Sequence, residues 1–351
     1  MMSWILDRAR LAAVAAAGLG IGVFLTFGWP LPFLFGPMAG CLVVALAGVQ
    51  LKGMGDLGAA MRTILGVAVG ASVTPAMVHD LPRMALTLSL VPVYLLLAGA
   101  LGYPLLRRVF GFDHPTAWYS AMPGGLQDMM AFGEEAGGDP RALSLVHATR
   151  ILLIVTLAPP LIWMLWGVDL HRPPGQSITD TPPVQLMLMA VAAMGGWWAA
   201  VKVRLFGASI LGPMIATAAL SLAGFVTMRP PAEAIWVAQV FIGLSIGVRY
   251  SGLGWGDVRL AVLAGLSLSL MLAALTGVFA EAIHSAGIAP HLESFMAFAP
   301  GGQAEMAVLA ILAGADVAFI VAHHVLRILI VITLSPVVER VWSKRLGGGR
   351  R

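Results

Sequence analysis

The chain contains one segment twice, and this duplication limits the folds that it can adopt. Residues 123–159 have the sequence PGGLQDMMAFGEEAGGDPRALSLVHATRILLIVTLAP, and residues 300–336 have the sequence PGGQAEMAVLAILAGADVAFIVAHHVLRILIVITLSP. The two copies align without a gap, from Pro123 with Pro300 to Pro159 with Pro336, and 14 of the 37 positions are identical. Asp128 in the first copy aligns with Glu305 in the second, so both copies have an acidic residue at this position. A fold for this chain must therefore give both segments equivalent places.

The composition predicts a membrane protein. Hydrophobic residues make up 59% of the chain and charged residues 11%, with a mean hydropathy of +0.90, whereas about a quarter of the residues of soluble domains are charged. The short alternating segments of a membrane barrel are absent, which leaves helices as the means of satisfying the backbone in lipid. We therefore expect an all-α polytopic membrane protein of about ten transmembrane helices. The expected spans lie near residues 9–27, 33–49, 58–76, 84–106, 141–166, 183–201, 208–227, 233–250, 258–282 and 315–339.

The distribution of basic residues predicts the orientation of these spans. With a cytoplasmic N-terminus and ten spans, 15 of the 21 Lys and Arg residues fall inside and three outside, and three lie within helices. Twelve spans would divide them 12 inside to 6 outside, which fits the rule less well. Because five spans per half is an odd number, the second half enters the membrane upside down. We expect two inverted five-helix repeats with both termini cytoplasmic.

The expected organisation is a first repeat over 1–172, an external linker over 173–182 and a second repeat over 183–351. The linker is polar and proline-rich, which is typical of a loop. Each repeat contains a Pro-Gly-Gly segment, over 119–136 and 295–313. Each repeat also contains a pair of glycines four positions apart, Gly66 with Gly70 and Gly243 with Gly247, which predicts close helix packing.

The Pro-Gly-Gly triplets predict a re-entrant or broken helix in each repeat, because proline donates no backbone hydrogen bond and glycine tolerates unusual dihedrals. Broken helices at equivalent places of inverted repeats are typical of secondary transporters, and a helix N-terminus at that depth favours an anion. We expect Gly124, Gly125, Gly301 and Gly302 to contact the solute. The alternative is an interfacial turn, after which Asp128 and Glu305 stabilise the helix N-terminus.

Each copy also contains an H-x-x-R pair, His147 with Arg150 and His324 with Arg327, whose members share a helix face. A helix that begins near Arg141 would bring Arg150 roughly 13 Å into the bilayer, where ionisable groups are costly and usually functional. We expect the two arginines, with Asp128 and Glu305, to bind substrate. The two histidines and the same acids are candidates for carrying a coupling proton. The alternative is a set of buried salt bridges between the arginines and the acids.

Asp139 and Asp316 directly precede apolar helices and are expected to be N-caps. The single cysteine, Cys41, excludes an intrachain disulfide and is expected in the core. We expect no metal and no cofactor. The expected partners are the lipid bilayer and a small solute, with a homodimer as a further association and no direct contact with nucleic acid.

The doubled motif, PGG-x-x-[DE]-M followed by G-x-D and H-x-x-R, resembles the bacterial membrane AbrB duplication family over essentially the full length. Members have labels such as ammonia monooxygenase and regulator of gene expression. The family is more distantly similar to the cation-proton antiporter and anion transporter superfamily, whose glutamate and citrate symporters have five-span inverted halves and a glycine-rich re-entrant loop. This resemblance implies a bacterial inner membrane protein and favours transport. PGG replaces the loop motif of those symporters, so their substrate contacts are not transferred.

Three functions follow as hypotheses. The first is a secondary transporter of a small anionic solute, coupled to protons. The second is a membrane-embedded sensor or regulator that signals through another protein, because the inner loops are too short for an output domain. The third is a copper oxygenase, which would need converging ligands, whereas His79, His171, His284 and His291 are scattered over three loops. We expect no enzyme, and the sequence specifies neither substrate nor coupling ion.

Overall fold

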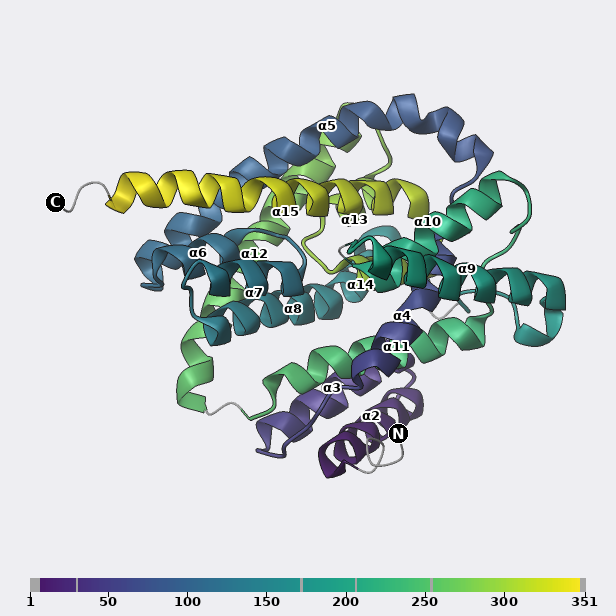
Figure 1. The fold of residues 1–351 in the computed structure, drawn as a ribbon, viewed down its shortest axis with the longest axis horizontal. Coiled ribbons are helices and arrows are strands. Elements are labelled where there is room, and N and C mark those ends of the chain that lie inside the picture. Colours follow the sequence, from purple (N-terminus) through teal and green to yellow (C-terminus); the bar gives the residue numbers. More distant parts are fainter. Residues whose placement is uncertain (1–6, 30, 171–172, 206, 253–254, 348–351) are drawn as a thin grey trace. The chain divides into compact units, whose positions relative to one another are not determined.

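The structure is a computed structural model that describes residues 7–29, 31–170, 173–205, 207–252 and 255–347 (Figure 1). These residues form helices joined by short loops, and they contain no strand. In chain order the elements are α2 (Arg8–Thr26), α3 (Pro32–Leu46), α4 (Gly55–Gly70), α5 (Pro75–Pro104), the π-helix η1 (Leu105–Val109), α6 (His114–Ala121), α7 (Leu126–Glu135), α8 (Pro140–Trp166), the 3-10 turn η2 (Ile178–Asp180), α9 (Pro183–Lys202), α10 (Ala208–Leu222), α11 (Ala232–Gly247), the 3-10 turn η3 (Val248–Tyr250), α12 (Trp255–Ser285), α13 (His291–Phe298), α14 (Gln303–Ala313) and α15 (Val317–Gly347).

Seven helices of the described chain are long and apolar enough to cross a membrane. They confirm the expected all-helical class and indicate a membrane protein. Three of the ten expected spans correspond to helices shorter than these seven, since α3 and α10 have 15 residues each and α4 has 16. The spanning segments are Arg8–Thr26, Met84–Val109, Pro140–Trp166, Pro183–Lys202, Ala232–Tyr250, Arg259–Ser285 and Val317–Trp342.

The helices of the described chain fall into two series of seven. Helices α2 to α8 are followed in the same order by α9 to α15. In the alignment that matches Pro123 with Pro300, helices α6, α7 and α8 begin at the same positions as α13, α14 and α15. The Pro-Gly-Gly triplets end one helix and precede the next in both copies, between α6 and α7 and between α13 and α14. In both copies the triplet thus lies between two helices.

The chain forms two compact units, and each contains helices of both copies. The first unit consists of α2, α3, α4, α9, α10, α11 and α14. The second unit consists of α5 from Pro82, α6, α7, α8 as far as Ala158, α12, α13 and α15 from Phe319. These units differ from the sequence repeats, whose boundaries stay predictions.

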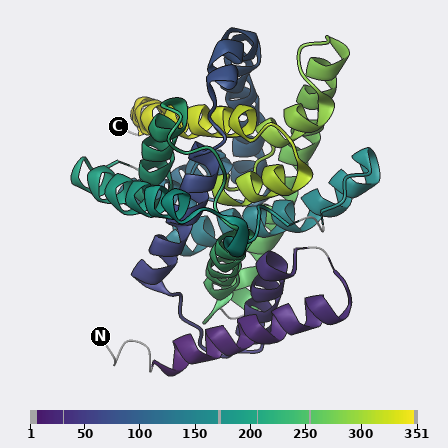
Figure 2. The same ribbon diagram turned by 90° about the vertical axis from the view of Figure 1, so that its right-hand side faces the viewer.

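In the first unit, two pairs of helices approach closely, and each pair joins one helix of the first copy to one helix of the second. Helix α4 packs on α10, and its counterpart α11 packs on α3. A Cβ added at Gly66 or Gly70 would collide with backbone oxygens of α10, and one at Gly243 or Gly247 would collide with backbone oxygens of α3. The predicted role of these glycine pairs is confirmed. Figures 1 and 2 both show α2 beside α3, which pack together in the same unit.

In the second unit the equivalent helices α5 and α12 run antiparallel. The Tyr94 hydroxyl lies 3.2 Å from Thr276 Oγ1, whereas a Cβ at Gly102 would lie 3.0 Å from Leu268 Cδ1. Residue numbers therefore rise along α5 as they fall along α12.

Helices α6 and α7 form a hairpin around the first triplet. The backbone N–H of Asp139, just after α7, donates to Thr116 Oγ1 at the start of α6 over 2.7 Å. The rings of Tyr119 and Phe132 pack between the two helices, with centroids 6.3 Å apart. The start of α6 and the end of α7 therefore lie together, and whether this hairpin is re-entrant in a membrane stays a prediction.

Candidate functional site

Arg150 fixes the turn of the first hairpin. Its side chain is buried, with 1% exposed. Nη1 donates to the carbonyl oxygen of Met122 over 3.2 Å, and Nη2 donates to that of Gly124 over 3.0 Å. The planar guanidinium has donors on both terminal nitrogens, so one side chain bridges two carbonyls on either side of Pro123.

Arg327 does the same in the second copy. It is 3% exposed, and Nη1 donates to Ala299 O over 2.7 Å while Nη2 donates to Gly301 O over 2.9 Å. Both acceptors occupy the aligned positions of their counterparts in the first copy. The two sites therefore have the same arginine and the same arrangement of backbone acceptors.

The histidines complete each site one helical turn away. His147 Nε2 lies 3.1 Å from Tyr119 O, and His324 Nε2 lies 3.0 Å from the equivalent Met296 O. A carbonyl oxygen only accepts, so Nε2 of each ring carries the proton. We call His147, Arg150 and the carbonyls that they bind the first clamp, and their equivalents around His324 and Arg327 the second clamp.

The alternative of a buried salt bridge between Arg150 and Asp128 is not what the structure shows, because the guanidinium donates to carbonyl oxygens of its own hairpin. Among the described residues of the second unit, neither clamp arginine has a carboxylate within ion-pair distance. The Nε atoms of Arg150 and Arg327 are buried without a hydrogen-bond partner in the described chain. Two buried positive charges are thus held without a carboxylate from the described part of their own unit.

The two clamps share an electrostatic environment. The charge of Arg327 acts on Arg150, and both charges act on the buried Tyr94 of α5. The Tyr94 hydroxyl contacts Thr276 of α12, whose own hydroxyl donates to Phe298 O over 3.0 Å. Polar side chains of the equivalent helices α5 and α12 therefore lie in the electrostatic environment of both clamps.

The glycines of the first triplet are closely packed. A Cβ at Gly124 would lie 2.8 Å from Val331 Cγ1, and one at Gly125 would collide with Asp128 Oδ2. Asp128 occupies the first turn of α7 and is partly exposed. Its carboxylate therefore lies over the N-terminus of α7, as the capping alternative predicted. For the second triplet, Gly301 is a clamp acceptor and Gly302 precedes α14.

Glu305 has different surroundings from its counterpart. It lies in the first turn of α14, in the first unit, and is only 8% exposed. Arg62 of α4 and Arg249 of η3 are the cations whose charges act on it. The sequence-based pairing of Glu305 with the clamp arginines missed these two cations.

Two further predictions can be compared with the structure. Asp139 caps α8, because Oδ1 accepts the backbone N–H of Arg141 over 2.8 Å, and Asp316 directly precedes α15. Cys41 is fully buried in α3. Of the histidines weighed as copper ligands, His171 and the side chain of His79 lie outside the described residues.

A second histidine pair was missed by the sequence reasoning. His114 and His291 begin α6 and α13, at aligned positions of the two copies. His114 Nδ1 lies 2.8 Å from the Tyr103 hydroxyl, and Nε2 lies 3.9 Å from Glu339 Oε1. Burial lowers the pKa of His114, and the nearby Glu339 opposes this effect. Extending the repeat alignment upstream of Pro123 would have revealed the pair.

The comparison with protein families identifies the family of the chain. The model described as "Transition state regulatory protein AbrB" matches residues 33–343, which is most of the chain. The chain belongs to the AbrB family. The resemblance inferred from the doubled motif is therefore confirmed.

Two relatives match this AbrB-family chain over most of their lengths. "Putative regulator AbrB" of Escherichia coli (strain K12) is 28% identical over 337 residues, which cover 93% of each chain. "Uncharacterized protein YhjN" of Bacillus subtilis (strain 168) is 27% identical over 293 residues, covering 78% of this chain and 76% of that protein. The first of these names and the family description contain the word regulator or regulatory, and the second name assigns no function.

Proposed function

We propose that this AbrB-family protein is a secondary transporter of a small anionic solute, built from two inverted five-helix repeats. In this proposal the protein lies in a bacterial inner membrane with both termini in the cytoplasm. The two Pro-Gly-Gly segments interrupt helices near the middle of the bilayer, and the solute binds beside the clamps. The proposal includes no enzymatic step, metal or cofactor, and it leaves the homodimer as a prediction from the sequence.

The direction of equivalent helices supports inversion. Helices α5 and α12 both contain a candidate membrane span, and they run antiparallel in one unit. If both cross the bilayer, the two repeats cross it in opposite senses. Units assembled from equivalent helices of both repeats are also what such a transporter needs, because its site forms where the repeats meet.

The charge of the clamps is the observation that carries the proposal. Arg150 and Arg327 are buried in the same unit, and each is satisfied by carbonyl dipoles without a carboxylate from the described part of that unit. An uncompensated buried charge is costly. A solute anion that accepts from the remaining Nε–H groups would offset this cost during transport, whereas a fixed salt bridge would keep the anion out.

The histidines supply a route for coupling to protons. Because Nε2 of His324 donates to Met296 O, its Nδ1 is the proton-accepting nitrogen, and this atom is buried without a hydrogen-bond partner in the described chain. His147 is the equivalent residue of the first clamp. In the proposal both histidines carry protons, while Asp128 and Glu305 contribute carboxylates at the starts of α7 and α14.

Uptake into proteoliposomes tests the proposal. A panel of carboxylates, amino acids and peptides is offered to the wild type, Arg150→Gln, Arg327→Gln and the matched control Arg141→Gln, whose side chain is exposed on the same helix as Arg150. We expect anion uptake by the wild type and control, and at least about a hundredfold loss in either clamp variant, since about 3 kcal/mol of charge-assisted binding corresponds to that factor. Full uptake by both clamp variants would remove the arginines from the mechanism.

Two further measurements test the coupling of uptake to protons and the alternative of a sensor or regulator. His147→Gln and His324→Gln should retain anion binding and lose the stimulation of uptake by a proton gradient. The family description and the name of the Escherichia coli relative contain the word regulatory or regulator, so a membrane-embedded sensor or regulator is the second candidate function. Saturable anion binding without any flux in the wild type would support that function instead.

A further inference from the structure

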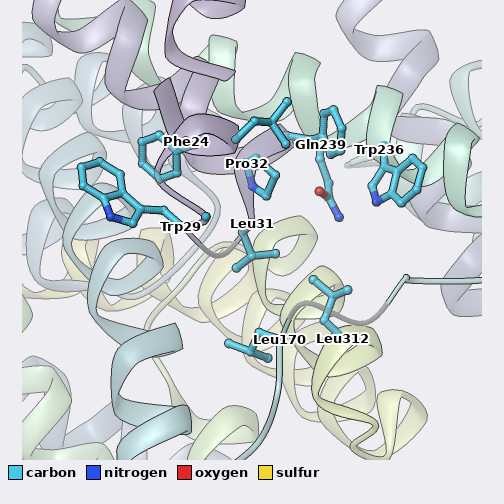
Figure 3. Close-up of a pocket in the computed structure, with 11 residues that line it drawn as sticks. Phe24, Trp29, Leu31, Pro32, Leu170, Trp236, Gln239 and Leu312 are labelled. Carbon is cyan, nitrogen blue, oxygen red and sulfur yellow. The ribbon is translucent and has the colours of Figure 1, made fainter. Parts of the chain in front are cut away.

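The first unit contains a cavity that the proposed transport cycle does not use. Its volume is about 200 Å³. Phe24 and Trp29 line it at the end of α2, with Leu31 before α3, Trp236 and Gln239 from α11, and Leu312 from α14 among the other lining residues (Figure 3). Apart from the Gln239 amide, the labelled side chains in Figure 3 are aliphatic or aromatic.

Gln239 is the one side chain with an unmet hydrogen-bonding need among the described residues that line the cavity. It is 1% exposed, and its Nε2 has no hydrogen-bond partner there. Figure 3 shows the amide directed into the space between Leu31, Leu312 and Trp236. A buried amide without a partner is unfavourable, and a water in an apolar cavity would need two to four polar partners. A ligand with one acceptor oxygen suits this cavity better than water.

A buried amide in an apolar cavity occurs at this place in only one of the two copies. In the alignment that matches Gly66 with Gly243, the counterpart of Gln239 is Arg62, whose Nε donates to Ser209 Oγ over 3.4 Å. In α3 and α10 the alignment matches Gly36 with Gly212, one residue out of step with the later helices, and there the counterpart of Ser209 is Phe33, which stacks on Trp236 with centroids 5.3 Å apart. A position with a charged side chain in one copy therefore corresponds to an aromatic-lined cavity in the other.

Leu31 has a backbone conformation that leucine rarely adopts. It precedes α3 with φ 56°, and the equivalent Gly207 precedes α10 with φ 57°. Glycine adopts this conformation without cost, whereas a leucine is strained there. Strained residues cluster at ligand sites, and the buried Leu31 side chain lines the cavity.

We propose that this cavity binds a small uncharged molecule of about the size of one six-membered ring, whose single acceptor oxygen accepts the Gln239 N–H. The size follows from the volume, because a cavity of about 150 Å³ accommodates benzene. An ion is unsuited, since none of the described side chains that line the cavity is charged and burying an unpaired charge is costly. Aromatic walls favour a flat ring.

Titration calorimetry of the full protein in lipid nanodiscs tests this inference with two probes of the same shape. Acetophenone has a carbonyl oxygen where α-methylstyrene has a methylene group. We expect the wild type to bind acetophenone about fivefold to tenfold more tightly, which is the worth of one neutral hydrogen bond. Gln239→Leu should bind both probes equally, and it removes an unsatisfied buried group, so the variant should fold.

Leu312→Phe, which fills the cavity, should abolish binding of both probes, whereas Arg62→Leu at the equivalent place should leave both affinities unchanged. Equal affinity of the two probes in the wild type, or a preference that survives in Gln239→Leu, would overturn the inference. Absence of binding by either probe would overturn it as well. These outcomes are independent of solute transport, because the site lies in the first unit and the clamps lie in the second.

Discussion

The helices that follow the two Pro-Gly-Gly triplets, α7 and α14, share a position in the repeat and differ in almost everything else. In α14 every residue from Ala304 to Leu312 is buried. In α7 the exposed Glu134 and Glu135 occupy the places of the buried Ile311 and Leu312. The clamps before these helices are nevertheless the same, with equivalent carbonyls bound by equivalent side chains.

This comparison shows that the clamps are the same in both copies, whereas the surroundings of the helix after the triplet differ. A clamp depends on one side chain and the carbonyls of its own hairpin, so it survives wherever the motif is intact. The helix after the triplet takes its character from its neighbours, and α14 belongs to the first unit whereas α7 belongs to the second. The carboxylate at the start of each helix therefore has a different electrostatic role in each copy.

The strongest challenge to the equivalence of the clamps is to remove each arginine in turn. Arg150→Gln and Arg327→Gln each lose two charge-assisted hydrogen bonds to buried carbonyls, so we expect each variant to lose about 3 kcal/mol of stability, although Met122 O keeps the backbone N–H of Gly124 at 2.9 Å. Lysine at either position should recover part of the loss, because one ammonium does not reproduce the planar fork. Thermal unfolding in detergent measures these changes, and a large loss in only one copy would contradict the equivalence.

The difference between the acids is sharpened by neutralising each of them. We expect Glu305→Gln to cost about 2 kcal/mol, because the buried carboxylate offsets the charges of Arg62 and Arg249. Asp128→Asn should cost less than about 1 kcal/mol, the usual contribution of a first-turn carboxylate. Arg62→Gln combined with Glu305→Gln should recover stability in a double-mutant cycle. Equal costs for the two acids would show that burial does not distinguish them.

The exchanged packing of the first unit predicts matched losses at matched glycines. Gly66→Ala and Gly243→Ala both force a methyl group against backbone oxygen, and overpacking of this kind costs roughly 1–3 kcal/mol. Gly18→Ala is the control, because nothing lies within 4 Å of a Cβ there, and alanine favours the helix. Chemical unfolding midpoints compare the three variants, and unequal losses at Gly66 and Gly243 would break the correspondence between α4 and α11.

The smallest effect concerns the histidine pair at the starts of the hairpins. The pKa of His114 is lowered from 6.5 by burial, so the unfolded chain takes up this proton more readily than the folded protein. Stability should therefore fall as the pH drops below 6.5, and His114→Gln should flatten this dependence. His291→Gln is the matched control in the second copy. Melting curves from mildly acidic to mildly alkaline pH that are unchanged by His114→Gln would contradict the assignment.

The sequence by itself determined the duplication, the helical membrane class and the breaks at the triplets. Apolar stretches, glycine spacing and proline chemistry are local properties, so they are visible without coordinates. The H-x-x-R spacing also placed His147 and Arg150 on one helix face. Tertiary structure alone decided what these side chains bind, because the acceptors are backbone carbonyls, and these have no sequence signature.

For the same reason, the sequence did not predict the partners of Glu305 or the cavity. Glu305 meets Arg62 and Arg249, and the cavity brings Leu31 from near the N-terminus to Gln239 and Leu312, pairings that no local pattern records. Such encounters depend on how the helices of two copies are distributed between two compact units. A repeated motif specifies its own turn and clamp through bonds within one hairpin, whereas the surroundings of each copy follow from packing between distant segments.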